Sequence, residues 1–173
     1  MEQLIRKARQ KDPDAFVQLM QLYMQDMYKV ARSYLKNDED AADAISDTIL
    51  ACYEKIHTLK KDKYFKTWMT RILINKCNDM LHKKKTLVLS DYTPEPAFWE
   101  EDYTNLEWNQ VLLSLDEKYR LVVMLYYVEG FKIREIAQIL DVSESTIQTR
   151  LARAREKLSK EYLNETRRSA HES

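Results

Sequence analysis

The chain has 173 residues, with 28 Lys and Arg balanced by 28 Asp and Glu, and it contains only one Gly and three Pro. So few turn-forming residues exclude a protein built from β-hairpins and predict an all-α fold. No apolar run is long enough to cross a membrane, and the first residues do not form a secretory signal. We therefore expect a cytoplasmic protein without membrane insertion.

Charge is distributed unevenly along the chain. Residues 1–85 carry 17 cationic and 12 anionic side chains, whereas residues 86–107 carry six anionic side chains and no cationic one. This acidic segment lacks helical periodicity and contains two of the three Pro. We therefore expect two small helical domains, at 1–85 and 106–165, joined by a flexible acidic linker at 86–105 and followed by a frayed tail at 166–173.

In the first domain, the spacing of apolar residues predicts four helices. They are expected at 2–10, 13–35, 40–57 and 65–84. Asp12 and Pro13 form the start signal of the second helix, because Pro fits the first helical position. The third and fourth helices are expected to bury Ala42, Ile45, Ile49, Cys52, Tyr53, Ile56, Trp68, Ile72, Met80 and Leu81.

Residues that carry catalytic or metal-binding chemistry are sparse. Cys52 and Cys77 lie within apolar helical patterns and are expected to be buried thiols. His57, His82 and His171 are far apart and lack metal-ligand spacing. The sequence also lacks a Gly-rich phosphate loop and a nucleophile elbow, so we expect no metal, no cofactor and no catalytic residue.

The second domain is predicted to begin with helices at 106–113 and 116–130, the latter ending on a Gly that suits a helix C-terminus. The stretch 131–155 then reads as a helix-turn-helix, the motif that places its second helix in the major groove of DNA. Asp141 suits the tight turn because Asp tolerates positive φ. Ser143 is expected to cap the second helix.

The second helix of this motif is expected to carry a polar, basic outer face. Its outward positions are Gln148, Thr149, Arg150, Ala152 and Arg153. Arg and Gln can read base edges, and Thr can contact a thymine methyl. A start two residues later would make Ser145 and Gln148 a capping box. The alternative is an ordinary amphipathic helix pair with a solvated basic face, but turn, cap and charge signals coincide here and favour DNA binding.

Three segments, taken in order, resemble the extracytoplasmic-function (ECF) group of σ70-family RNA polymerase sigma factors. They are DAADAISDTI at 40–49, YFKTWMTRILINKCND at 64–79, and the stretch 115–158. Ser46 stands where the family often has Gln, and Ser145 stands where the recognition helix commonly has Gly. The resemblance implies a monomeric, non-enzymatic protein that binds core RNA polymerase and promoter DNA and is controlled by an anti-sigma factor.

The resemblance also assigns sigma region 2 to residues 1–85 and region 4 to residues 106–165. It implies that the acidic linker threads through polymerase toward the active-site channel. Composition alone is equally compatible with a passive tether.

Four acidic side chains are predicted near one face of the third helix, opposite its apolar stripe. They are Asp40, Asp43, Asp47 and Glu54. By itself such a pattern can be a solvated face. The resemblance implies that this face docks on a coiled coil of the polymerase clamp.

The loop at 60–65 combines cations with aromatic rings, a mixture that suits an unpaired nucleic-acid strand. Alternatively, Phe65 and Trp68 are simply core residues, which we favour for Trp68. The resemblance implies that this loop and the fourth helix capture a base flipped from the minus-ten element, through Lys63, Tyr64, Phe65, Arg71, Asn75, Asp79 and Lys83. It implies that the minus-thirty-five element is read as duplex by Ser145, Thr146, Gln148, Thr149, Arg150 and Arg153.

Two rival functions are compatible with the same sequence. A helix-turn-helix transcriptional regulator with an N-terminal dimerisation or sensor domain would bind palindromic DNA without polymerase. A helical adaptor would bind polymerase without contacting DNA.

Overall fold

The structure, a computed structural model, describes residues 1–87 and 106–171, and every regular element in these ranges is helical. This confirms the predicted all-α fold. The chain divides into two compact units. The expected linker at 86–105 lies outside the described residues, except for residues 86 and 87 at the end of the fourth helix.

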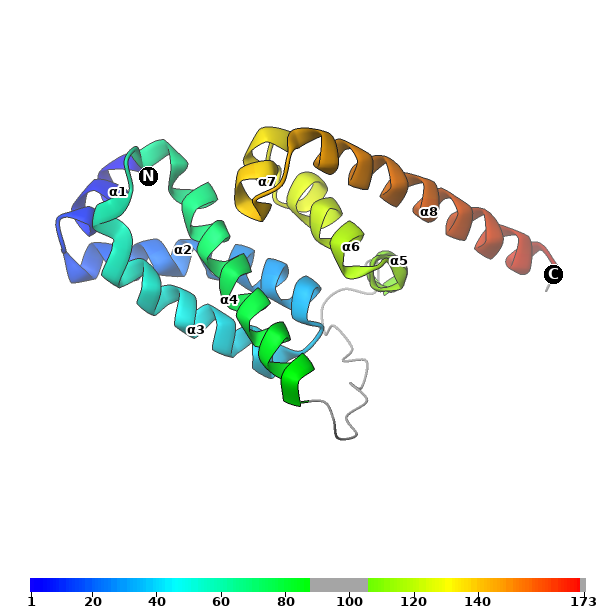
Figure 1. The fold of residues 1–173 in the computed structure, drawn as a ribbon, viewed down its shortest axis with the longest axis horizontal. Helices are drawn as coiled ribbons and strands as arrows, with labels where there is room; N and C mark the ends of the chain where they lie inside the picture. Colours follow the sequence, from blue (N-terminus) through cyan, green and yellow to red (C-terminus); the bar gives the residue numbers. More distant parts are fainter. Residues whose placement is uncertain (88–105, 172–173) are drawn as a thin grey trace. The chain divides into compact units, whose positions relative to one another are not determined.

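The first unit is a bundle of four helices (Figure 1). They are α1 (Glu2–Arg9), α2 (Pro13–Leu35), α3 (Asp38–Lys55) and α4 (Phe65–Leu87), with the short 3₁₀ turns η1 (Ile56–Thr58) and η2 (Asp62–Tyr64) between α3 and α4. α2, α3 and α4 pack against one another, and α1 packs on α2. The predicted loop before α4 is therefore partly helical.

Polar side chains fix the starts of α2 and α3. The Asp12 carboxylate accepts hydrogen bonds from the backbone N–H groups of Asp14 at 3.0 Å and Ala15 at 3.1 Å, which confirms the predicted start signal. The Asn37 side chain accepts from the N–H of Asp40 at 2.9 Å, so α3 begins two residues earlier than predicted. Between these helices, Lys36 adopts a left-handed conformation with φ 58°.

The predicted core face of α3 is partly wrong. Ala42 and Tyr53 are exposed, whereas Ala41, Ala44 and Thr48 are buried. α3 packs against both α2 and α4, and small Ala side chains allow such close approach. The Thr48 hydroxyl is buried without cost to its hydrogen bonding because it donates to the Ala44 carbonyl at 2.6 Å.

The predicted core face of α4 also needs correction. The residues expected in the core are only half-buried: Trp68, Ile72, Met80 and Leu81. The buried apolar stripe instead comprises Phe65, Met69, Leu73, Ile74 and Cys77. Most of these recur every four residues and so lie on one side of the helix. The bulky residues that we expected in the core lie beside this stripe.

The second unit contains the helix-turn-helix. Its elements are α5 (Leu106–Ser114), α6 (Glu117–Val123), the π-helical turn η3 (Met124–Val128), α7 (Ile133–Leu140) and α8 (Glu144–His171). α8 continues to His171, so the backbone of residues 166–171 is helical where we expected a frayed tail. The segment 156–171 contains no Gly or Pro to break the helix.

Three predicted turn residues of this unit are confirmed. Gly130 has φ +72° and ends the helix that began at α6, and Asp141 has φ 55° in the turn between α7 and α8. The Ser143 hydroxyl accepts a hydrogen bond from the N–H of Thr146 at 3.2 Å, so Ser143 is the N-cap of α8 and the later start is excluded.

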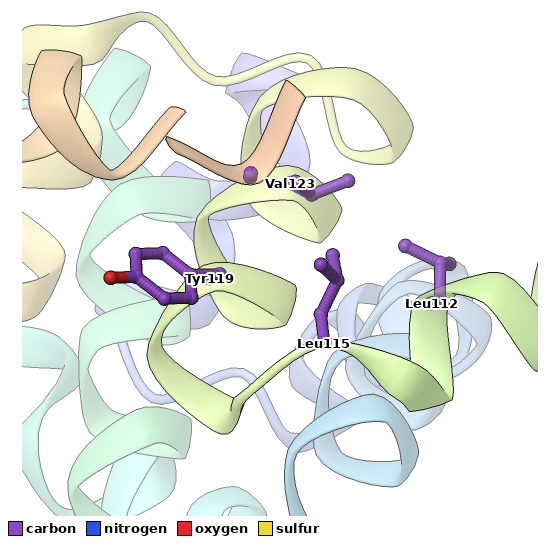
Figure 2. Close-up of a cluster of buried hydrophobic side chains, with 5 residues drawn as sticks. Leu112, Leu115, Tyr119 and Val123 are labelled. Atoms are coloured by element: carbon purple, nitrogen blue, oxygen red, sulfur yellow. The ribbon is translucent and has the colours of Figure 1, made fainter. Parts of the chain in front are cut away.

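α6 packs against α8. A buried cluster joins Leu112 of α5, Leu115, Tyr119 and Val123 to Ala154 of α8 (Figure 2). The Tyr119 ring belongs to this cluster, and Figure 2 shows its hydroxyl pointing away from Leu112 and Leu115. The cluster therefore anchors the ring while leaving the hydroxyl available to polar neighbours.

Candidate functional site

An acidic face, which we define as Asp43, Asp47 and Glu54, lies exposed on α3. The fourth predicted member, Asp40, is half-buried and forms an ion pair with Lys84 of α4. Leu50, which sequence analysis missed, is 59% exposed and falls on the same side of the helix. The face therefore offers carboxylates around an apolar side chain, a surface suited to a partner with Lys or Arg beside an apolar patch.

The η2 turn presents a cation and an aromatic ring. Lys63 and Tyr64 are exposed, and the Lys63 Nζ lies 4.9 Å from the centroid of the Tyr64 ring. Asp62 fixes this turn, because its carboxylate pairs with Arg9 at 2.7 Å and with Arg6 at 3.8 Å. Sequence analysis did not foresee this anchor, which joins residues 53 positions apart.

Phe65 is wrongly assigned to a nucleic-acid surface. Its side chain is 1% exposed, and its ring centroid lies 5.4 Å from that of Tyr23 and 5.9 Å from that of Trp68. Trp68, which we favoured as core, is half-buried. Phe65 is therefore a core residue, and the exposed aromatic side chain of this segment is Tyr64.

The remaining candidates on α4 form one stripe. Arg71, Asn75, Asp79 and Lys83 are exposed and recur every four residues, so they follow one another along the same side of the helix. We call these four residues the α4 stripe. It combines two cations, an amide and a carboxylate, groups that can contact phosphates and base edges.

The candidates on α8 are mostly exposed. Ser145, Gln148, Thr149 and Arg153 are exposed, and Thr146 and Arg150 are half-buried. The Thr149 hydroxyl donates to the Ser145 carbonyl at 2.9 Å, and the Ser143 cap lies 2.8 Å from the Thr146 hydroxyl. The N-terminal turns of α8 thus present a polar, cationic surface.

The two cysteines are buried, as predicted. Burial raises the pKa of Cys52 and that of Cys77 from 9.0 to about 12. Among the side chains that the structure describes, at 1–87 and 110–161, no group of three or more His, Cys, Asp or Glu could hold a metal ion. In the same ranges, no helix combines the length and apolar character needed to span a membrane.

We predict that the native protein resists thiol alkylation. At pH 8 Cys52 and Cys77 should remain protonated and shielded, whereas urea-unfolded protein should be labelled fully by a maleimide. Because the folded pKa values lie above the unfolded value of 9.0, the stability that these thiols contribute is present below that pH and is lost as pH rises toward 12. Rapid labelling of native protein at pH 8 would contradict this burial.

Comparison with known proteins places both units in one family. The family model for Sigma-70 region 2 matches residues 19–86, and the model for Sigma-70 region 4 matches residues 106–158. The RNA polymerase sigma factor SigV of Bacillus subtilis is 32% identical over 149 residues, covering 82% of this chain and 90% of SigV. The ECF sigma factor SigM of Mycobacterium tuberculosis is 30% identical, covering 88% of this chain and 81% of SigM. The chain belongs to the ECF sigma factors of the σ70 family.

Solved sigma factor structures share the fold of this ECF sigma factor. CnrH, in a complex with the cytosolic domain of CnrY, is 26% identical with a TM-score of 0.69, covering 91% of this chain and 94% of CnrH. RpoE of Bartonella quintana, in a complex with the anti-sigma factor NepR, has a TM-score of 0.75 at 22% identity, covering 84% of this chain and 94% of RpoE. In this sigma factor, the region 2 match includes α3 and α4, and the region 4 match includes the helix-turn-helix.

Proposed function

We propose that this ECF sigma factor binds core RNA polymerase through the acidic face of α3 and recognises promoter DNA at two separate places. The observation that carries the proposal is the exposure of three polar surfaces within the two matched regions: the acidic face, the α4 stripe with η2, and the outer face of α8. Regions 2 and 4 then correspond to the domains expected at 1–85 and 106–165.

Region 2 would hold the minus-ten element as a melted strand. The exposed Tyr64 ring can stack on an unpaired base, Lys63 and Arg71 can hold phosphates, and the Asn75 amide can pair with a base edge. The buried Phe65 supports this surface without contacting the strand. Asp79 and Lys83 extend the same stripe.

Region 4 would read the minus-thirty-five element as duplex DNA. Arg150, Arg153 and Gln148 supply donors that can contact base edges in the major groove or the flanking phosphates. Ser145, Thr146 and Thr149 add hydroxyl groups near the N-terminus of α8, where phosphates are also favoured.

Control by a protein partner follows from the same surfaces. The structures of CnrH and RpoE both contain a bound protein, and RpoE's partner is an anti-sigma factor. We infer an anti-sigma factor for this chain, which would cover surfaces needed for polymerase or promoter. Polymerase performs the chemistry, so the chain is no enzyme and acts as a monomeric subunit in the cytoplasm.

A gel shift with and without core polymerase tests the proposal against its rivals. We expect a specific DNA complex only when core polymerase is present, and run-off transcription on genomic fragments should then identify the promoters. Specific binding to palindromic DNA without polymerase would support the transcriptional regulator. Polymerase binding without promoter-specific initiation would support the adaptor.

Alanine substitution in α8 should reduce promoter use. Arg150→Ala, Arg153→Ala and Gln148→Ala each remove a donor that can reach the groove. Loss of a base contact should cost about 1–3 kcal/mol and relax preference at one base pair, whereas loss of a phosphate contact should weaken all sequences alike. Run-off transcription from promoters with single upstream substitutions measures both. If all three variants transcribe like the parent, α8 does not contact the promoter.

A further inference from the structure

A hollow of about 240 Å³ opens on the surface of the second unit, between the start of α6 and the first turns of α8. Its charged lining consists of Lys118, Arg150 and Arg153, and its remaining lining residues all carry hydroxyl groups: Tyr119, Ser145, Thr146 and Thr149. The lining therefore has three positive charges and no carboxylate. It is also smaller than the ~300–1,000 Å³ of a typical small-molecule pocket.

Two of the three cations that line this hollow form no ion pair within the described part of the chain. Lys118 and Arg150 form no ion pair there, in contrast to Lys157, which pairs with Asp116 at 2.9 Å, and Lys160, which pairs with Glu156 at 2.7 Å. A lining with three cations and no carboxylate favours an anion. The adjacent N-terminus of α8 adds backbone N–H groups and a favourable dipole.

Tyr119 holds part of the hollow in place. Its side chain is 6% exposed, with the ring in the buried cluster and the hydroxyl directed away from the leucines (Figure 2). A hydrogen bond from Arg153 lowers the pKa of Tyr119, and the charges of Lys118, Arg153 and Lys157 act in the same direction. The Lys118 Nζ lies 5.1 Å from the ring centroid. Tyr119 therefore interacts with two of the cations that line the hollow, Arg153 and Lys118.

We propose that this hollow binds one backbone phosphate of the duplex read by α8, with Lys118 of α6 supplying a contact from outside the helix-turn-helix. The inference rests on the proposed duplex recognition by region 4. A phosphodiester carries one negative charge and several acceptor oxygens, which match the convergent cations and hydroxyls. Such a contact fixes the register of α8 on the duplex and carries no sequence information itself.

The test compares Lys118→Gln with Lys160→Gln in holoenzyme reconstituted from core polymerase and the full chain. Both substitutions remove one positive charge, but Lys160 lies outside the hollow. On a promoter fragment recovered by run-off transcription, Lys118→Gln should reduce the slope of log affinity against log salt by about 1. The loss of affinity should be equal on promoters with altered upstream bases. Lys160→Gln should have the same affinity and the same salt dependence as the parent.

A scan of methylphosphonate linkages locates the phosphate. At one upstream linkage, removing the phosphate charge should weaken promoter binding by the parent holoenzyme but not by the Lys118→Gln holoenzyme. Identical responses of both holoenzymes at every linkage, or loss of core binding by Lys118→Gln, would overturn the proposal. If the parent holoenzyme is instead indifferent to a scrambled upstream element, the proposed duplex recognition itself fails.

Discussion

Reversing Asp43 and Asp47 to Lys is expected to weaken binding to core RNA polymerase by roughly 100-fold or more. The double variant replaces two exposed carboxylates of the acidic face with cations. Against a basic partner surface, like-charge contacts cost several kcal/mol, and about 3 kcal/mol corresponds to a 100-fold loss. Fluorescence titration of labelled sigma factor with core polymerase gives the affinity directly.

The matched control is Ala42→Lys, which adds a cation at an exposed position on a different side of α3. It should bind core polymerase like the parent. Leu50→Ala separates the apolar contribution of the face from its charge, because Leu50 is exposed between the carboxylates. Thermal unfolding should be nearly unchanged for all variants, since exposed substitutions usually alter stability by less than about 0.5 kcal/mol. If the double variant binds core polymerase as tightly as the parent, the acidic face is not part of the polymerase interface.

Tyr64→Ala and Asn75→Ala are expected to impair promoter opening more than initial promoter binding. Stacking of a base on an aromatic ring contributes about 1–3 kcal/mol, so loss of the Tyr64 ring should reduce open complexes roughly 5- to 150-fold. A pre-melted promoter should restore part of the activity of both variants, because unpairing, which costs a few kcal/mol, has already occurred. Permanganate footprinting on duplex and bubble templates measures this difference.

Tyr64→Phe is the control for this result, because it keeps the ring and removes only the hydroxyl. It should open promoters far better than Tyr64→Ala. Activity equal to the parent on duplex DNA for both Tyr64→Ala and Asn75→Ala would reject their role in strand capture. A defect that the bubble does not relieve would point to a contact with strand or polymerase that is separate from melting.

Local rules were sufficient to predict much of the fold. Asp12, Ser143 and Asp141 occupy the cap and turn positions expected of them. Asp12 and Ser143 accept hydrogen bonds from nearby backbone N–H groups, and Asp141 tolerates the positive φ of the turn. Burial depends on distant partners and was harder to predict. Thr48 is buried on α3, which packs against α2 and α4. Phe65 is in the core while Trp68 is half-buried, because packing across helices selects these faces. The π-helical turn at Met124–Val128 was also not foreseen, and we find no sequence signal for it.

In the candidate surfaces, too, features within one helix were predictable and contacts between helices were not. The spacing of Asp43, Asp47 and Glu54 along one helix was enough to predict a shared exposed face. The ion pair of Arg9 with Asp62, by contrast, joins separate elements, and no periodic pattern records it. Residues on one helix can be grouped from sequence, whereas the contacts that orient them become visible only in the folded chain.

Under the strand capture that we propose for Tyr64, the ion pairs that join α1 to Asp62 would link α1 to DNA melting. A chain shortened to begin at residue 11, just after α1, would keep the start of α2 and every exposed residue of the acidic face and the α4 stripe. It would lose Arg6 and Arg9 and leave the half-buried Asp62 carboxylate without the guanidinium groups that hold it. Tyr64, two residues further on, would then sit on an unanchored turn. Under the proposed function, truncation or fusion at α1 would therefore change how a base is captured, although no residue of α1 need touch the DNA.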